Sequence, residues 1–234
     1  MTGSSGDATA IAPDGSGGVR GSRIAMAGFL FAALFVTGWL LVRDSPLSDA
    51  TDSQLLAYFG DPDNRLRSTI AGLYVIPFAC IAFIWFVAAL RDRYLRNATR
   101  ENTILSTAHL VSGALVVTSL FALAAVELAV VWLAEAGRSG GTDGQRALLA
   151  FGEAMSSIMA LRSAAVFVGV SSSRAVRTGL FPRAYGVASM LTAVALLVLY
   201  QSAPWVTLLF PAWVAASSVL ILIRRHARDL ADGA

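Results

Sequence analysis

Long apolar stretches separated by short polar connections form the pattern of this chain. A membrane crossing needs about 20 predominantly apolar residues in an α-helix. Six stretches of roughly this kind are predicted to span a membrane, over residues 24–42, 69–90, 104–133, 147–170, 185–200 and 206–223. The sequence therefore predicts an all-α fold, a polytopic membrane protein whose single domain, residues 24–224, is a bundle of six transmembrane helices.

Polar segments flank and connect these stretches. Residues 1–23 are rich in Gly, Ser and Asp and have few large apolar side chains, which predicts a disordered cytoplasmic tail. Residues 225–234 are predicted to form a basic C-terminal tail. In the longest connection, Thr51 precedes the segment 54–60, a pattern typical of a short capped helix that ends at a glycine. We expect the leucines and aromatic side chains of this helix to rest on the membrane surface.

The distribution of arginine predicts the orientation of the bundle. All 18 basic residues are arginines. Twelve of them lie in the N-terminal tail, the second and fourth connections and the C-terminus, against five in the other connections. Because basic residues concentrate on the cytoplasmic side of membrane proteins, both termini are predicted to be cytoplasmic, in a multi-pass protein of the plasma membrane. Anionic lipid headgroups are expected partners of the cytoplasmic arginines.

Composition agrees with this class and argues against others. The chain is 56% hydrophobic and only 14% charged, whereas soluble domains have about 25% charged residues. The net charge of +3 is modest, and the arginines flank apolar stretches instead of forming a basic stripe, so nucleic-acid binding is not indicated. The single cysteine, Cys80, cannot form an intrachain disulfide.

Three ionisable side chains, Glu127, Glu153 and Arg162, are set well inside apolar stretches. A charge at bilayer depth costs about 2.5 to 3.5 kcal/mol on insertion scales, so each needs a partner, a water-filled cavity or a nearby interface. Glu127 and Glu153 are predicted at similar depth near the outer side, where they could face each other and carry a proton or bind a cation. Alternatively, each reaches the outer surface or bonds a neighbouring Ser or Thr.

Arg162 is predicted to face the opposite side of its helix from Glu153, because nine residues at 100° per residue give half a turn out of phase. It could reach the cytoplasmic interface, meet a lipid phosphate, or bond a carbonyl freed by a kink. On the same helix Gly152, Ser156, Ala160 and Ala164 recur every four residues. Such a stripe of small side chains predicts a helix-packing face.

Motifs for catalysis and metal binding are missing from the sequence. HExxH, G-x-S-x-G and the phosphate loop do not occur. The two histidines, His109 and His226, do not form a haem-binding pair on facing helices, and His109 is predicted to be an interfacial hydrogen-bonding residue. The segment 61–72 departs from a calcium loop because Arg65 and Leu66 replace the required oxygen ligand and glycine. We therefore expect no enzyme, cofactor or metal.

Three groups of short motifs carry a resemblance to a known family. They are Ala57-Tyr58-Phe59 with Asn64-Arg65, Trp85-Phe86 with Leu90-Arg91, and Thr178-Gly179-Leu180-Phe181-Pro182-Arg183-Ala184-Tyr185-Gly186. With them the chain, over roughly residues 24–200, resembles a family of uncharacterised actinobacterial six-helix integral membrane proteins, related to a widespread bacterial membrane domain of unknown function. Family members more often have Trp-Leu-Gly where this chain has Ala184-Tyr185-Gly186. The resemblance implies a fold and carries over no functional residue.

Two functions from different classes follow from these features. The first is a non-catalytic accessory or scaffold subunit that packs against another membrane protein, a second copy of itself, or lipid, as the small-residue stripe indicates. The alternative is a small transporter or proton-coupled sensor that uses Glu127, Glu153 and Arg162. A membrane enzyme acting on lipid is a third and weaker hypothesis, because a nucleophile and a base would have to converge from separate helices.

Overall fold

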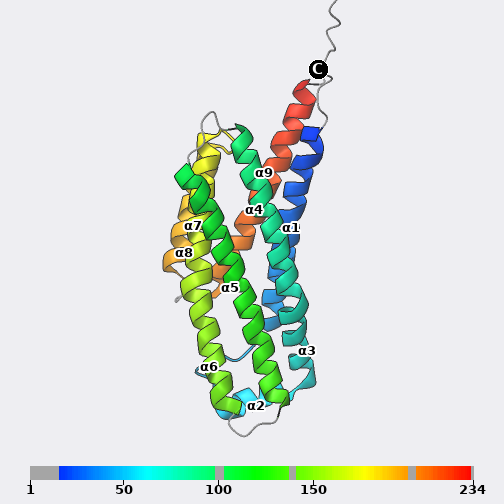
Figure 1. Cartoon of the computed structure of the whole chain (residues 1–234), viewed down its shortest axis with the longest axis vertical. Helices are drawn as coiled ribbons and strands as arrows, with labels where there is room; N and C mark the ends of the chain where they lie inside the picture. The colour runs from blue at the N-terminus through cyan, green and yellow to red at the C-terminus, as the bar shows by residue number, and fades with distance from the viewer. Residues whose placement is uncertain (1–15, 98–102, 137–140, 200–203, 233–234) are drawn as a thin grey trace, which may run out of the picture.

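Helices and the short connections between them make up the described part of the chain. The computed structural model describes residues 16–97, 103–136, 141–199 and 204–232, and no strand occurs in these ranges. Figure 1 shows the helices running side by side in an elongated bundle. Within the described residues, five helical stretches are long and apolar enough to cross a membrane. They are Ile24–Val42, Pro62–Arg96, Thr103–Glu135, Thr142–Arg177 and Trp205–Arg224, and a sixth apolar helix, Arg183–Val198, is shorter.

Two of the long helices contain a π-helical segment. The elements in chain order are α1 (Ser16–Val42), α2 (Asp52–Gly60), α3 (Pro62–Ile70), η1 (Ala71–Val75), α4 (Ile76–Asn97), α5 (Thr103–Glu135), α6 (Gly141–Ala154), η2 (Met155–Ala160), α7 (Leu161–Arg177), α8 (Arg183–Val198), η4 (Pro204–Leu208) and α9 (Leu209–Asp232). The π segments η1 and η2 continue directly into the α-helices beside them, so α3–η1–α4 and α6–η2–α7 are each one long rod.

The ends of the chain differ from the predicted tails. The predicted disordered tail is wrong for residues 16–23, because α1 begins at Ser16, while residues 1–15 lie outside the described part. The predicted C-terminal tail is likewise helical as far as Asp232. Extending an existing helix adds one hydrogen bond for each residue fixed, whereas starting a helix is costly. The apolar stretches therefore supply helices that continue into polar sequence.

Aromatic side chains from four helices meet in the core. The ring of Phe83 on α4 lies 4.8 Å from Phe31 on α1, 5.2 Å from Phe167 on α7 and 5.4 Å from Phe210 on α9, measured between centroids. The two contacts with Phe167 and Phe210 are edge-to-face, an arrangement that the quadrupoles of the rings favour. Large apolar side chains such as Leu191 remain exposed on the flanks of the bundle. The packed centre and apolar flanks are what a bundle surrounded by lipid requires.

The short helix α2 forms as predicted, but two of its apolar side chains are buried in the bundle. Gln54 N donates to Thr51 Oγ1 at 3.3 Å and Thr51 N donates to Gln54 Oε1 at 2.8 Å, which completes a capping box. The expectation that its apolar side chains rest on the membrane surface is wrong for Leu55 and Phe59, which are buried against Val126, Val130, Val131 and Leu149 of α5 and α6, whereas Leu56 remains exposed. At 1.5 Å per residue α5 is about 50 Å long, against about 30 Å of hydrocarbon, so its far end offers apolar surface for α2 to cover.

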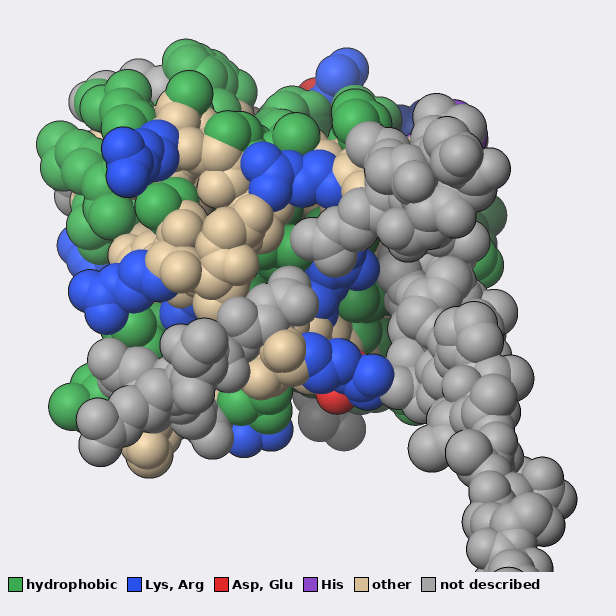
Figure 2. Space-filling model, turned by 90° about the horizontal axis from the view of Figure 1, so that it is seen from above, with side chains coloured by type: hydrophobic (Ala, Val, Ile, Leu, Met, Phe, Trp, Pro, Cys, Tyr) green, Lys and Arg blue, Asp and Glu red, His purple; other side chains and the backbone are tan. Residues whose placement is uncertain are grey.

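Charge is distributed unequally between the two ends of the bundle. The C-terminal ends of α4, α7 and α9 lie together at the upper end in Figure 1. Seen from that side, Figure 2 shows basic side chains spread over the face. The described arginines at this end are Arg91, Arg93 and Arg96 on α4, Arg174 and Arg177 on α7, Arg183 at the start of α8, and Arg224 on α9. Among the described side chains at this end, Asp92 carries a carboxylate, and it pairs with Arg96 at 2.9 Å. The opposite end holds the aspartates of the first connection.

Candidate functional site

Glu127 lies on α5 where that helix meets the π segment η1. A Cβ atom on Gly72 would lie 2.8 Å from the carbonyl oxygen of Ala124 and 3.3 Å from Cβ of Glu127, so η1 and α5 approach closely at this level. Although Glu127 as a residue is partly buried, its carboxyl group is deeply enclosed, and Ser68 is its polar neighbour. Within the described residues, no arginine forms an ion pair with it. The bundle therefore encloses a carboxyl group that has no basic partner in the described part of the chain.

Two adjoining pockets meet at Glu127. The inner pocket has a volume of about 200 Å³ and extends between α1, α4 and α5. The outer pocket has a volume of about 230 Å³ and lies beneath the connection between α1 and α2. Six residues line both of them: Trp39, Val42, Leu123, Glu127, Ser156 and Thr207. Because the shared lining includes Glu127, its side chain lies at the junction of the two pockets.

Glu153 lines the outer pocket as well, so the structure brings the two predicted glutamates to one site. The Glu153 carboxylate is already bonded, because Ser48 donates to it from its backbone N at 2.6 Å and from Oγ at 2.9 Å. Hydrogen bonds to an ionised group are among the stronger ones. Glu153 therefore ties the connection after α1 to α6, while Glu127 has no such bond from the backbone of the described chain.

Arg162 is not brought to the glutamates. It is exposed, lines neither pocket, and donates from Nη1 to the carbonyl oxygen of Ser157 at 2.8 Å. In η2 the N–H of Leu161 bonds to the carbonyl of Ser156, five residues back, instead of to Ser157 as in an α-helix. The Ser157 carbonyl is thereby left for Arg162. Of the three predicted environments for Arg162, the structure has the freed carbonyl.

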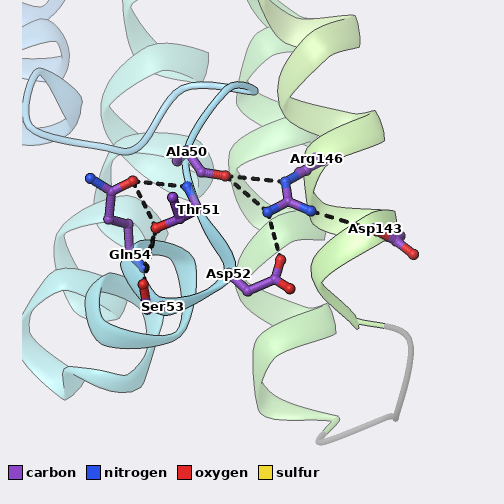
Figure 3. A network of polar contacts seen from close by, with 7 residues as sticks. All are labelled: Ala50, Thr51, Asp52, Ser53, Gln54, Asp143 and Arg146. Carbon is purple, nitrogen blue, oxygen red and sulfur yellow. Dashed lines mark hydrogen bonds and ion pairs between the residues drawn. The ribbon is translucent and has the colours of Figure 1, made fainter.

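Arg146 on α6 fixes the same connection at a second point (Figure 3). Its Nε and Nη2 donate to the carbonyl oxygen of Ala50 at 3.1 and 3.0 Å, and Nη2 lies 2.6 Å from a carboxylate oxygen of Asp52. A longer contact of 3.7 Å joins Nη1 to Asp143 on the same helix. Together with Ser48, these contacts hold residues 43–51 over the outer pocket.

A third hollow lies on the other side of this connection. This vestibule has a volume of about 680 Å³ and shares Pro46 and Leu47 with the outer pocket. Tyr58 lines the vestibule, and burial raises the pKa of its phenol, with a further rise from the charge of Glu127. Ser68 and Ser45 act on the pKa of Tyr58 in the opposite direction through their side chains. Tyr58 and Ser68 therefore connect the vestibule electrostatically with Glu127.

The predicted packing stripe faces the interior of the chain itself. A Cβ atom on Gly152 would lie 3.2 Å from Cγ1 of Val126 on α5, which shows how closely α6 approaches α5 there. Ala164 is buried, Ala160 is partly buried, and Ser156 lines both pockets. At Gly152, at least, the small side chain makes room for a helix of the same chain.

His109 lies near the basic end and is buried, not interfacial as predicted. Its Nε2 lies 3.4 Å from the carbonyl oxygen of Val87, to which it can only donate, and its Nδ1 lies 2.9 Å from Ser171 Oγ. Tyr94 donates to the carbonyl of Ser171 at 2.9 Å, and the guanidinium of Arg174 lies 4.9 Å from the Tyr94 ring centroid. This cluster joins α4, α5 and α7.

Sequence reasoning missed the residues that surround Glu127 and Glu153. Ser48, Ser68 and Thr207 lie in three separate segments of the sequence, and no spacing points to them. Within the described residues, no three His, Cys, Asp or Glu side chains are close enough to hold a metal ion. The sequence-based expectation of a polar site around Glu127 and Glu153 therefore acquires a geometry made of hydroxyl groups, two carboxyl groups that form no ion pair among the described residues, and apolar walls.

Comparison with known proteins gives no relative for this chain. No family model, no curated protein and no solved structure matches it. The resemblance to the actinobacterial six-helix family therefore stays a prediction.

Proposed function

We propose that the chain is a six-span protein of the plasma membrane, with both termini in the cytoplasm, that acts as a small transporter or proton-coupled sensor. The observation that carries the functional part is the enclosed carboxyl group of Glu127 at the junction of two pockets, without a basic partner among the described residues. A carboxyl group at membrane depth without a partner is costly, and such groups mark ion and proton pathways.

Glu127 and Glu153 have different parts in this proposal. Glu127 exchanges a proton or binds a cation, because its carboxyl group borders open volume on two sides. Glu153 positions the connection over the outer pocket through its two bonds to Ser48. Arg162 drops out of the proposed site because it bonds a backbone carbonyl on the exposed side of η2. The proposal needs no catalytic step, cofactor or metal.

The scaffold hypothesis is the less supported of the two. It was motivated by the stripe of small residues and by the arginine-rich cytoplasmic connections, and Gly152 of that stripe packs against α5 of the same chain. Contact with anionic lipid headgroups is compatible with either function, because the arginines at the basic end are placed for it if that end is cytoplasmic. Binding of another membrane protein or of a second copy stays an untested alternative.

Cysteine labelling tests the proposed topology. Cys80 is buried and is replaced by alanine to give a cysteine-free background. Ser53→Cys, on exposed α2, then reports the first connection, and Arg177→Cys reports the turn after α7. We expect a membrane-impermeant maleimide to label Ser53→Cys in intact cells and Arg177→Cys only after permeabilisation. The reverse pattern, or equal labelling of both, contradicts the proposed orientation.

The functional test uses purified protein in lipid nanodiscs and in proteoliposomes. The fluorescence of Trp39, which lines both pockets, is isolated by subtracting the signal of Trp39→Phe and followed against pH. Proton entry into proteoliposomes is followed in parallel with an internal pH indicator. We expect Glu127→Gln to abolish the pH response of Trp39 or the proton flux, and Glu135→Gln, an exposed glutamate on the same helix, to leave both intact. Unchanged behaviour in both Glu127→Gln and Glu153→Gln removes the proposal.

A further inference from the structure

We infer that the inner pocket binds a small organic cation with an apolar body, whose ammonium group lies against Glu127. This inference deepens the proposed function and rests on it, because it names the class of ligand for the same carboxyl group. Three features lead to it: the lining of the inner pocket, the shortage of oxygen ligands around Glu127, and the acidic entrance from the vestibule.

The inner pocket is apolar apart from one end. Its walls include Phe35, Leu120 and Ile76, and the polar side chains that reach it are Glu127, Ser156 and Thr207. Ligand pockets are typically apolar with a few polar groups that fix the orientation of the ligand. Here the charged group is a carboxylate, so the complementary ligand has a cationic head and an apolar body. At about 200 Å³ the pocket is smaller than the roughly 300 Å³ at which drug-sized sites begin.

Inorganic cations fit this lining poorly. Calcium takes about six to eight oxygen ligands, and magnesium requires a near-octahedral set of about six. Among the described residues that line it, the inner pocket offers the side-chain oxygens of three, Glu127, Ser156 and Thr207. An ammonium group needs fewer acceptors and can use aromatic faces, and Phe35 and Trp39 both line the pocket. The chemistry of the walls therefore favours an organic ammonium over a metal ion.

The approach to the pocket is also suited to a cation. Asp44 and Asp49 line the vestibule, and the vestibule shares Pro46 and Leu47 with the outer pocket, which in turn meets the inner pocket at Glu127. A cleft lined by one sign of charge raises the local concentration of oppositely charged solutes. Arg43 lines the outer pocket and is paired with Asp44 at 3.5 Å, so these two charges partly offset each other, and Asp49 is the vestibule carboxylate that has no ion pair among the described residues.

Binding of phenethylamine, which is protonated at pH 7, tests the inference. Radiolabelled phenethylamine is titrated onto the protein in nanodiscs, with empty nanodiscs subtracted, and 2-phenylethanol serves as a neutral competitor of similar shape. We expect saturable binding that Glu127→Gln weakens at least about tenfold, since a desolvated charge pair is lost, and that Glu135→Gln leaves within about twofold. Ala79→Leu, which fills the inner pocket at a buried lining position, is expected to weaken binding as well.

Several outcomes overturn the inference. The inference is contradicted if phenethylamine shows no saturable binding, or if it binds Glu127→Gln as tightly as the unchanged protein. If Glu127→Gln does not elute as a folded species, competition experiments on the unchanged protein still decide the question. Recognition of an organic cation is contradicted if 2-phenylethanol competes for the site as well as unlabelled phenethylamine does. It is also contradicted if sodium displaces phenethylamine at equal concentration. A Trp39 pH response that depends on Glu127 while phenethylamine fails to bind leaves the proposed function standing and refutes only the ligand class.

Discussion

The contacts of Arg146 make the attachment of α2 a sharp test of the structure. Replacing Arg146 by methionine keeps an unbranched apolar side chain but removes the bonds to Ala50 and the ion pair with Asp52. The Arg146 side chain is 33% exposed, whereas that of Asp52 is 61% exposed. The loss should therefore come mainly from the backbone carbonyl of Ala50, which keeps no guanidinium partner, and less from the ion pair.

The magnitude follows from these contacts. A hydrogen bond to a charged group contributes about 1.5 to 3 kcal/mol, and because both N–H groups of Arg146 share one carbonyl we count about 2 kcal/mol for them together. The exposed pair with Asp52 adds about 0.5 kcal/mol after screening by solvent. Opening of the connection and α2 should thus become easier by about 2 to 2.5 kcal/mol, or roughly 30- to 70-fold.

Hydrogen exchange of the α2 amides in nanodiscs measures this change. We expect the amides of residues 55–60 to exchange roughly 30- to 70-fold faster in Arg146→Met, while the amides at the centre of α5 are unaffected. Asp143→Asn is the matched control, because its side chain is 92% exposed and lies 3.7 Å from Arg146, and it should change α2 exchange less than about twofold. Equal protection of α2 in Arg146→Met and the unchanged protein would refute the assignment of Arg146 as its anchor.

Three further predictions concern packing, a buried bond and pH. Gly72→Ala places a Cβ atom 2.8 Å from a carbonyl oxygen of α5 and should lower the free energy of unfolding by about 1 to 3 kcal/mol. The measurement is the thermal midpoint of unfolding, which should fall in Gly72→Ala but not in Gly60→Ala, where the added Cβ atom meets open space. Tyr94→Phe removes a buried 2.9 Å bond to α7 and should cost about 1 to 2 kcal/mol, unlike Tyr74→Phe at an exposed position. Burial raises the pKa of Tyr58 above 10.0, so its stabilisation is full below about pH 10 and is lost as the pH rises through the raised pKa. Alkaline absorbance titration should show a late-titrating tyrosine that is missing in Tyr58→Phe, and a Tyr58 signal at the ordinary pH contradicts this.

The helices were predictable because their main cause is local. A stretch of apolar residues of membrane length is recorded in the sequence itself, and each predicted stretch corresponds to a helix of the described chain. The exception is the end of the fifth stretch, because α8 ends at Val198 and residue 200 lies outside the described part. Helix ends were less predictable, as Ser16 and Asp232 show, because extension of a helix into polar residues depends on small differences in free energy. The number of membrane spans stays a prediction, since α8 is shorter than the other apolar helices.

The site was predictable in depth but not in detail. Counting residues from the helix ends placed Glu127 and Glu153 at one level, and the two side chains do line one pocket. The partner of Glu153 is Ser48, which is 105 residues away in sequence and has no local signature. Helical phase fails for a related reason: the half-turn between Glu153 and Arg162 assumed 100° per residue, which does not hold through the π segment η2.

A π segment is an α-helix that has absorbed one extra residue in a wider turn, so the rods on both sides keep their register. Deleting one residue within η2 should therefore restore a regular helix and leave α6 and α7 packed as they are, whereas the same deletion in the middle of α5 would rotate everything after it by about 100°. The two π segments are thus the places where the length of these long helices can vary by one residue without rebuilding the bundle, although a deletion in η2 would alter the pocket wall to which Ser156 contributes.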